Sequence, residues 1–201
     1  MPKPEAHVVL YVVDLDELRE WVGSMDEERF RAAWQVVQED EDSDWEPEEL
    51  TRLEALLRRV IFEGRLYEGL GDEEKYYLTQ LLIDLFDEFG DHEALSEDVP
   101  LEPLARVAEA MSRDREGARL ARYLVRGREL GGDAVLWKEG PVGDVLSFLG
   151  YVTRQEAPAL VKSLDAFMAR PEGKAHRLAK LLRAAAAECA EAELDLVSFV
   201  G

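Results

Sequence analysis

The stretch 7-HVVLYVVDLDELREWVG-23 changes from strand to helix within a few residues, and this change indicates the class of the fold. Its first seven residues are almost wholly apolar and rich in β-branched and aromatic side chains, which is typical of a buried strand. Asp14 follows directly and can cap a helix, with two further acids in the positively polarised first turn. Leucines, Trp21 and Val22 then recur at helical spacing, and Gly23 ends the helix.

Apolar residues recur every three or four positions through much of the remaining chain, which predicts a series of helices with one core-facing side. In the first half, the predicted helices span 26–38, 47–64 and 73–89. In the second half, they span 101–112, 114–130, 153–169 and 172–193. The stripe of the helix beginning at Pro47 consists of Leu50, Leu53, Leu56, Leu57, Val60 and Ile61.

Two local signals predict helix ends in the second half. Gly131 and Gly132 are expected to close the helix that spans 114–130. The tetrad 153-TRQE-156 has the pattern of a capping box, in which the Thr153 hydroxyl accepts from the Glu156 amide and the Glu156 carboxylate reaches back. This box is expected to open the next helix.

In addition to the strand at 7–13, the sequence predicts short strands or extended segments at 133–137 and 145–152 and a strand at 194–200. Strands at both ends and in the middle, separated by long helices, favour an α+β fold. We therefore predict a helix-dominated single domain over residues 1–201, with a small sheet formed by the N-terminal, middle and C-terminal strands. Acidic loops are predicted near 38–47 and 90–100. The order of the strands in the sheet does not follow from the pattern.

Three segments together resemble a bacterial family of domains of unknown function. They are 11-YVVDLDELREWVG-23, with its Val-Asp-Leu-Asp start, 150-GYVT-153, and 194-LDLVSFV-200, with its Leu-Asp-Leu-Val-x-Phe end. The resemblance covers most of the chain in order and implies a single α+β domain. It implies no activity, cofactor or catalytic residue. The stretch 38–50 is more acidic than the resemblance implies.

The formal net charge of −20 lies wholly in the first half of the chain. Residues 1–100 hold 29 Asp and Glu against 9 Lys and Arg, whereas the two kinds balance in residues 101–201. Such a surface repels nucleic acids and anionic membranes and favours a basic protein partner. Solubility alone is the alternative explanation.

The sequence also bears on the compartment. Cys189 is the one cysteine, so no internal disulfide forms and a reducing compartment is expected. No signal peptide is visible, and no apolar run approaches the roughly 20 residues that cross a bilayer. We therefore expect a soluble, cytoplasmic protein. Its oligomeric state does not follow from the sequence.

The stretch 38-QEDEDSDWEPEEL-50 raises the question of a calcium loop, because Asp40, Asp42 and Asp44 are two residues apart. An EF-hand loop that began at Asp40 would need glycine at its sixth position and an acid at its twelfth. Those positions hold Trp45 and Thr51, and a start two residues later fails likewise. The stretch is therefore not an EF-hand. Trp45 either folds back on the core or anchors a partner.

Other chemistry is sparsely indicated. His7, His92 and His176 lie far apart in the sequence and do not form metal-binding spacings, although His92 stands among carboxylates. Cys189 lies on an Ala-rich helix with no neighbouring base, and no nucleotide-binding or nucleophile motif is present. We accordingly predict no catalytic residue, no metal site and no cofactor.

Arg115, Arg119, Arg122 and Arg126 are spaced by four, three and four residues, so they share one helix face. Such a stripe can bind phosphates or carboxylates, which makes these residues candidates for anion binding. Alternatively, they pair with acids of the first half or face water.

The sequence supports two functional hypotheses. The first is a non-enzymatic protein-binding or regulatory protein that docks a basic partner through Asp40, Glu41, Asp42, Asp44 and Trp45. The second is an enzyme or metal-binding protein whose site is assembled from scattered carboxylates, His92 and the stripe Arg115–Arg126. The lack of a catalytic motif favours the first hypothesis and leaves the question of an enzyme open.

Overall fold

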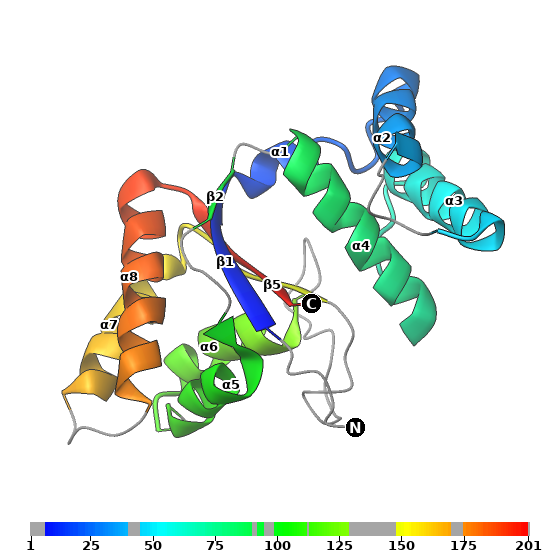
Figure 1. Ribbon diagram of the computed structural model, residues 1–201. Helices are drawn as coiled ribbons and strands as arrows, with labels where there is room; N and C mark the ends of the chain where they lie inside the picture. Colours follow the sequence, from blue (N-terminus) through cyan, green and yellow to red (C-terminus); the bar gives the residue numbers. More distant parts are fainter. Residues whose placement is uncertain are drawn as a thin grey trace, which may run out of the picture. The chain divides into compact units, whose positions relative to one another are not determined.

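The computed structural model describes residues 7–39, 45–89, 92–94, 99–111, 113–128, 148–169 and 175–200 (Figure 1). The chain divides into two compact units. The sheet unit consists of Met1–Val13 and His92–Gly201, and the helical unit consists of Asp14–Asp91. The predicted α+β class is confirmed, because helices dominate and a small sheet joins strands from the start, middle and end of the chain.

The sheet is antiparallel in every described pairing, with the order β2-β1-β5-β4 and with β3 also paired to β1. The register places Leu10 opposite Ser198 and Val12 opposite Leu196. The strands are β1 (His7–Val13), β2 (His92–Ala94), β3 (Val99–Pro100), β4 (Phe148–Val152) and β5 (Asp195–Val200).

Two of these strands lie within 90–100, where the sequence predicts a loop. Both β2 and β3 pair with β1 along the edge that does not face β5. This pairing has a physical reason, because β1 is buried along most of its length and its backbone groups on that edge need hydrogen-bond partners. Of the other predicted strands, 133–137 lies outside the described residues, and β4 covers the later part of 145–152.

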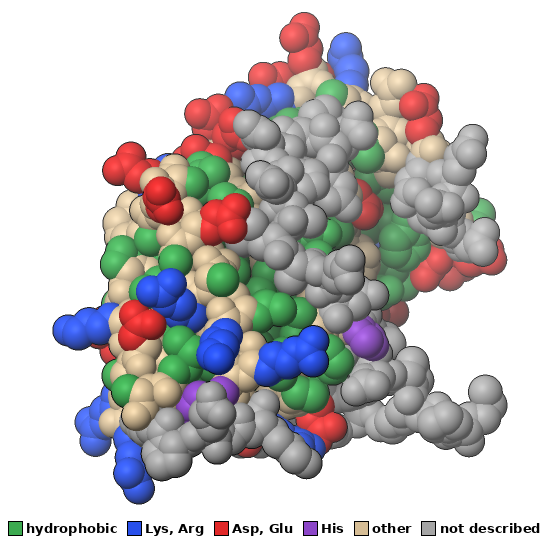
Figure 2. Space-filling model, turned by 60° about the vertical axis from the view of Figure 1, so that its left-hand side comes forward, with side chains coloured by type: hydrophobic (Ala, Val, Ile, Leu, Met, Phe, Trp, Pro, Cys, Tyr) green, Lys and Arg blue, Asp and Glu red, His purple; other side chains and the backbone are tan. Residues whose placement is uncertain are grey.

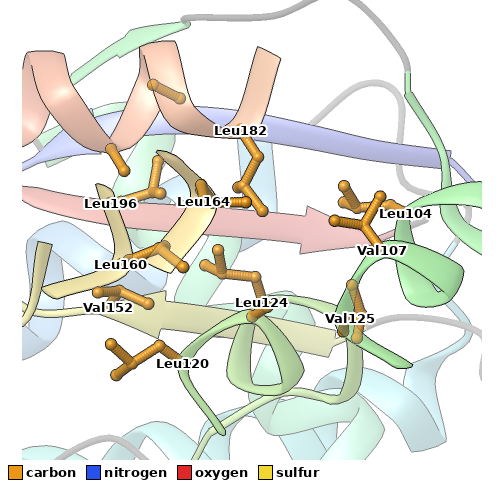
Figure 3. Packing of buried hydrophobic residues seen from close by; sticks show 14 of the residues in the cluster. Leu104, Val107, Leu120, Leu124, Val125, Val152, Leu160, Leu164, Leu182 and Leu196 are labelled. Carbon is orange, nitrogen blue, oxygen red and sulfur yellow. The ribbon is translucent and has the colours of Figure 1, made fainter. Parts of the chain in front are cut away.

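Four helices of the sheet unit pack on one face of the sheet (Figures 1 and 3). They are α5 (Leu101–Ala110), α6 (Arg115–Arg126), α7 (Ala157–Met168) and α8 (His176–Ala192). The strand residues Val8, Leu10, Val12, Val152 and Leu196 point into this core. Figure 3 shows the helix residues that meet them, among them Leu104, Val107, Leu120, Leu124, Val125, Leu160, Leu164 and Leu182.

Two glycines let α6 approach its neighbours closely. A Cβ atom on Gly150 of β4 would lie 2.3 Å from the Tyr123 carbonyl oxygen and 2.6 Å from Ser198 Oγ. A Cβ atom on Gly117 of α6 would lie 2.4 Å from the Ser163 Cβ atom of α7. Because real Cβ atoms do not approach so closely, both positions require glycine for α6 to lie directly on β4 and α7.

The helical unit contains α1 (Leu15–Arg19), α2 (Glu27–Glu39), α3 (Pro47–Glu63) and α4 (Asp72–Phe89). The predicted cap of α1 is confirmed, since the Asp14 carboxylate accepts a hydrogen bond of 2.9 Å from the Asp16 amide. Helices α2, α3 and α4 pack on one another. Their buried residues include Phe30, Ala33, Val37, Leu53, Leu56, Leu57, Val60, Ile61, Leu78, Leu81, Leu82 and Leu85.

Three predicted helix boundaries need correction. Helix α1 ends at Arg19 and not at Gly23, because the amides of Trp21 and Val22 bond three residues back in tighter turns and the Gly23 amide donates to the Val60 carbonyl oxygen. Helix α6 ends at Arg126, four residues before the predicted end, because Gly127 has a φ of +72° and the Arg128 amide then donates to the Leu149 carbonyl oxygen (3.1 Å). Only one half of the predicted capping box forms. The Glu156 carboxylate accepts from the Thr153 amide (3.2 Å), but the Glu156 amide donates to the Thr153 carbonyl oxygen (2.8 Å) instead of the hydroxyl. Helix α7 therefore begins at Ala157, directly after the tetrad.

Candidate functional site

Of the five residues predicted to bind a partner, the structure describes Trp45. Asp40, Glu41, Asp42 and Asp44 lie outside the described residues. The Trp45 side chain is half-buried, and its ring centroid lies 5.9 Å from that of Tyr77 on α4, with an interplanar angle of 55°. Trp45 thus folds back on the helices, which is one of the two alternatives that the sequence leaves open.

Tyr77 connects this tryptophan to charged groups of α3 and α4. Its hydroxyl donates to Glu49 Oε1 (2.7 Å), and the Arg52 guanidinium lies 4.8 Å from its ring centroid. Arg52 also pairs with Glu73 at 2.5 Å. The hydrogen bond with Glu49 raises the pKa of Tyr77 and lowers the pKa of the Glu49 carboxyl group. Two aromatic rings, two carboxylates and one guanidinium therefore form a continuous cluster directly after the stretch 40–44.

The acids at the start of α3 also have a local structural role. The Glu46 amide donates to Glu49 Oε2 at 2.9 Å, and Pro47 occupies the first helical position, where no amide hydrogen is needed. Glu48 and Glu49 lie in the first turn, where the helix dipole stabilises negative charge. These acids therefore support the helix while they extend the acidic stretch that precedes it.

Acids outnumber bases more strongly in the helical unit than in the whole chain. Residues 14–91 hold 25 Asp and Glu against 8 Lys and Arg, a net of −17. Six of its seven arginines form ion pairs inside the unit, namely Arg19, Arg29, Arg31, Arg52, Arg58 and Arg65. The seventh, Arg59, donates to the carbonyl oxygens of Leu66 and Glu68. The arginines of this unit are thus already engaged, and an excess of carboxylates remains.

The predicted arginine stripe lies on α6, away from the buried side of that helix. Arg115, Arg119 and Arg122 are exposed, and Arg126 is half-buried. Arg119 pairs with Glu156 at 3.5 Å and donates to the Tyr123 hydroxyl at 3.1 Å. Its acidic partner therefore comes from the second half of the chain and from the sheet unit, not from the first half. Whether the stripe binds anions stays a prediction.

Basic residues are also separated from acids along α8. Arg177, Lys180 and Arg183 lie in its first half, whereas Glu188 and Glu191 lie in its second half. Figure 2 shows both Lys and Arg side chains (blue) and Asp and Glu side chains (red) on one face of the molecule. The sheet unit thus presents both signs of charge.

A buried charged cluster around Arg128 is absent from the sequence-based predictions. Arg128 is only 5% exposed, and its guanidinium lies 4.3 Å from the Tyr123 ring centroid and 4.6 Å from that of Tyr151. It donates to Glu156 Oε2 at 2.5 Å. Burial alone would raise the pKa of Glu156, but the hydrogen bonds from Arg128 and Thr153 hold that pKa below its ordinary value.

A second buried ion pair lies beside this cluster. The Asp195 carboxylate is buried, and it accepts from the Arg154 amide (2.7 Å) and from Arg154 Nη2 (3.2 Å). Both pairs join the turn before α7 to other parts of the sheet unit. Because each charge already has a close partner of opposite sign, we assign both pairs to the stability of that turn. In the sequence, the predicted capping box 153-TRQE-156 was the one feature that drew attention to the region of these two ion pairs.

The structure describes part of the residues considered for metal binding and catalysis. Within the described ranges, no group of three or more His, Cys, Asp and Glu residues is placed to hold a metal ion. His92 belongs to β2, and its side chain lies outside the described part of the structure. His176 is buried against Phe167, with ring centroids 5.4 Å apart. Burial raises the pKa of the Cys189 thiol to about 12, so this cysteine is not a ready nucleophile.

Comparison with models of protein families, with curated proteins and with solved structures finds no match for this chain. The resemblance of its two ends to a bacterial family therefore stays a prediction. Among the described helices, none is long and apolar enough to cross a membrane.

Proposed function

We propose that this protein is a non-enzymatic, cytoplasmic binding or regulatory protein that docks a basic partner protein on its acidic helical unit. The observation that carries the proposal is the net charge of −17 on residues 14–91, within which every arginine is already bound to another group of the unit. A partner that brings Lys and Arg side chains would meet carboxylates whose nearby cations are occupied. Nucleic acids and anionic membranes would be repelled.

In this proposal, the stretch 40–44 and the start of α3 form the centre of the docking surface. Trp45, the residue that follows this stretch, packs on Tyr77 of α4. Glu46, Glu48 and Glu49 then continue the negative charge into the helix. Charge complementarity would chiefly speed the encounter with the partner, and contacts with apolar groups would supply most of the lasting affinity.

Affinity capture at two salt concentrations tests the proposal. The immobilised protein is incubated with lysate in about 0.1 M and about 1 M salt, where the Debye length is roughly 10 Å and 3 Å. We expect basic proteins to be retained at the lower salt and released at the higher. The test variant replaces Asp40, Glu41, Asp42 and Asp44 by Asn or Gln and is expected to lose about tenfold or more of the retained partner.

The matched control removes four exposed acids from the sheet unit, by the changes Glu109→Gln, Glu116→Gln, Glu188→Gln and Glu191→Gln. The net charge then changes by the same amount, but the helical unit is untouched. If the control loses the partner as strongly as the test variant, overall charge is responsible and the proposed surface is wrong. If neither protein retains a basic partner at the lower salt, the docking function itself is wrong.

A further inference from the structure

Met25 lies in the connection between α1 and α2, and its side chain is the most exposed large hydrophobic side chain among the described residues. It is 72% exposed, and no other large hydrophobic residue in the described ranges is so open to solvent. A single exposed apolar residue needs no explanation by itself. The backbone of Met25 makes this one unusual.

Met25 has a φ of +54°, in the left-handed region that glycine and asparagine adopt more readily than other residues. The loop is held there by two hydrogen bonds, from the Met25 amide to the Ile61 carbonyl oxygen and from the Gly23 amide to the Val60 carbonyl oxygen, both 2.9 Å. The next residue, Asp26, accepts bonds of 2.8 and 3.2 Å from amides in the first turn of α2. The side chain of Met25 is therefore displayed from a fixed backbone.

Stability does not account for methionine at this position. Glycine or asparagine would adopt the same backbone at lower cost, and a polar side chain would suit the exposure. Residues kept in an unfavourable backbone region often belong to binding sites. The unbranched, polarisable side chain of methionine adapts to differently shaped apolar partners, which suits a contact residue.

The charges around Met25 indicate what such a contact would bind. Glu20, Asp26 and Glu27 flank it in the chain, and their side chains are 70%, 43% and 54% exposed, although each lies within ion-pair distance of Arg29 or Arg31. The excess of negative charge that faces a ligand is therefore that of the whole helical unit. The nearest base along the chain, Arg29, is bound to the Glu20 carbonyl oxygen (2.6 Å) and carboxylate (3.2 Å). A second copy of this chain is disfavoured as the occupant, since its helical unit carries the same net of −17.

We propose that Met25 is the apolar anchor of a docking surface for an amphipathic basic segment, in which an apolar side chain lies between Lys or Arg residues. The inference rests on the proposed function and adds the kind of segment that the helical unit recognises. The acid excess of the helical unit attracts the basic residues, and Met25 contacts the apolar side chain between them.

Two synthetic helical peptides of equal length and equal lysine content test this inference on the full chain. Both peptides have lysine along one face of the helix. The opposite face carries leucine in one peptide and serine in the other. Calorimetry at about 0.1 M salt is expected to show binding of the Lys/Leu peptide at least about tenfold tighter than that of the Lys/Ser peptide, as for burial of one large apolar side chain. The Met25→Asn variant should bring this ratio close to one, and the Met25→Leu variant should keep it.

Thermal unfolding of the same variants gives a readout that a merely structural role would not produce. Met25→Asn should unfold at the same or a higher temperature than the wild type, and Met25→Leu at the same or a lower one. The variant that loses the preference for the Lys/Leu peptide would then be at least as stable as the variant that keeps it. An unchanged ratio in Met25→Asn, or equal binding of both peptides by the wild type, overturns the role of Met25 and leaves basic docking standing. If the wild type binds neither peptide, both this inference and the proposed function fail.

Discussion

The sheet unit and the helical unit differ in where they place their charges. In the sheet unit, 19 acids stand against 16 bases, and two of the ion pairs, Arg128–Glu156 and Arg154–Asp195, are largely buried. In the helical unit, 25 acids stand against 8 bases, and the ion pairs lie on the surface. Buried pairs are costly to break, whereas exposed pairs contribute little to stability.

This difference separates two uses of charge in one chain. Charge in the sheet unit joins segments that are distant in the sequence, as Arg154 and Asp195 do. Charge in the helical unit remains in excess at the surface, where it favours a basic partner and repels itself. We therefore expect substitutions in the sheet unit to act mainly on stability and those in the helical unit mainly on binding.

The largest expected effect is that of Gly150→Ala in the sheet unit. The new Cβ atom would lie 2.3 Å from the Tyr123 carbonyl oxygen and 2.9 Å from the Leu124 Cα atom, so α6 and β4 would have to separate. We expect a loss of about 3 kcal/mol in the free energy of unfolding, measured by urea denaturation. The control is Gly71→Ala in the helical unit, whose new Cβ would come no closer than 3.7 Å to another group. Equal stability of the two variants would contradict the close packing.

The second prediction concerns Arg128→Met, which keeps the length of the side chain and removes its charge. The Glu156 carboxylate would lose its shortest partner, and the rings of Tyr123 and Tyr151 would lose the cation between them. We expect a loss of about 2 kcal/mol, because Glu156 keeps its bond from Thr153 and its pair with Arg119. Arg58→Met in the helical unit, where the pair is exposed, should cost less than about 1 kcal/mol. A similar cost for both would remove the contrast between the units.

The third prediction uses the lowered pKa of Glu156. A carboxyl group whose pKa is lower in the folded state stabilises the fold above its unfolded pKa, and this contribution is lost as the pH falls through the folded pKa. We expect the wild type to lose stability on acidification below about pH 4.5, the ordinary value, partly because of this group. Urea midpoints of the wild type and of Glu156→Gln should therefore converge as the pH falls. A constant difference from pH 7 to pH 3 would show that the ionised carboxylate contributes nothing.

The smallest expected effect concerns the self-repulsion of the helical unit. Added salt screens like charges, so amides of α2–α4 should exchange their hydrogens more slowly in about 0.5 M salt than at low salt. We expect a change of a few tenths of a kcal/mol in opening free energy there and a smaller one in α5–α8. Hydrogen exchange read by mass spectrometry separates the two sets of peptides. Equal changes in both units would show that the charge excess does not act locally.

Much of the local structure follows from the sequence, as α3 shows. Its apolar spacing predicts the buried side and Pro47 marks its first residue, and both predictions are confirmed. The end of α6 could not be predicted in the same way. Gly127 directly follows its last residue, but Gly131 and Gly132 offered a second stop signal, and the sequence does not say which one ends the helix. The bond from the Arg128 amide to the Leu149 carbonyl oxygen, which depends on tertiary packing, favours the earlier one.

The candidate site was predictable only in its charge. The composition of residues 38–50 indicates an acidic surface, and Trp45 is conspicuous within it. That Trp45 lies on Tyr77, and that Tyr77 in turn donates to Glu49, depends on how α3 and α4 pack. The left-handed backbone of Met25 is likewise hidden in the sequence, because methionine gives no sign of it.

The sequence alone therefore determined most of the helices, the strands β1, β4 and β5, the α+β class and the acidic first half, but not β2 and β3. These properties depend on residues within a few positions of one another, or on composition, and both can be read directly along the chain. Only the tertiary structure decided the strand order, the buried pairs of Arg128 and Arg154, the need for glycine at position 150, and the display of Met25. Each of these depends on contacts between residues far apart in the sequence, which exist only once the whole unit has packed.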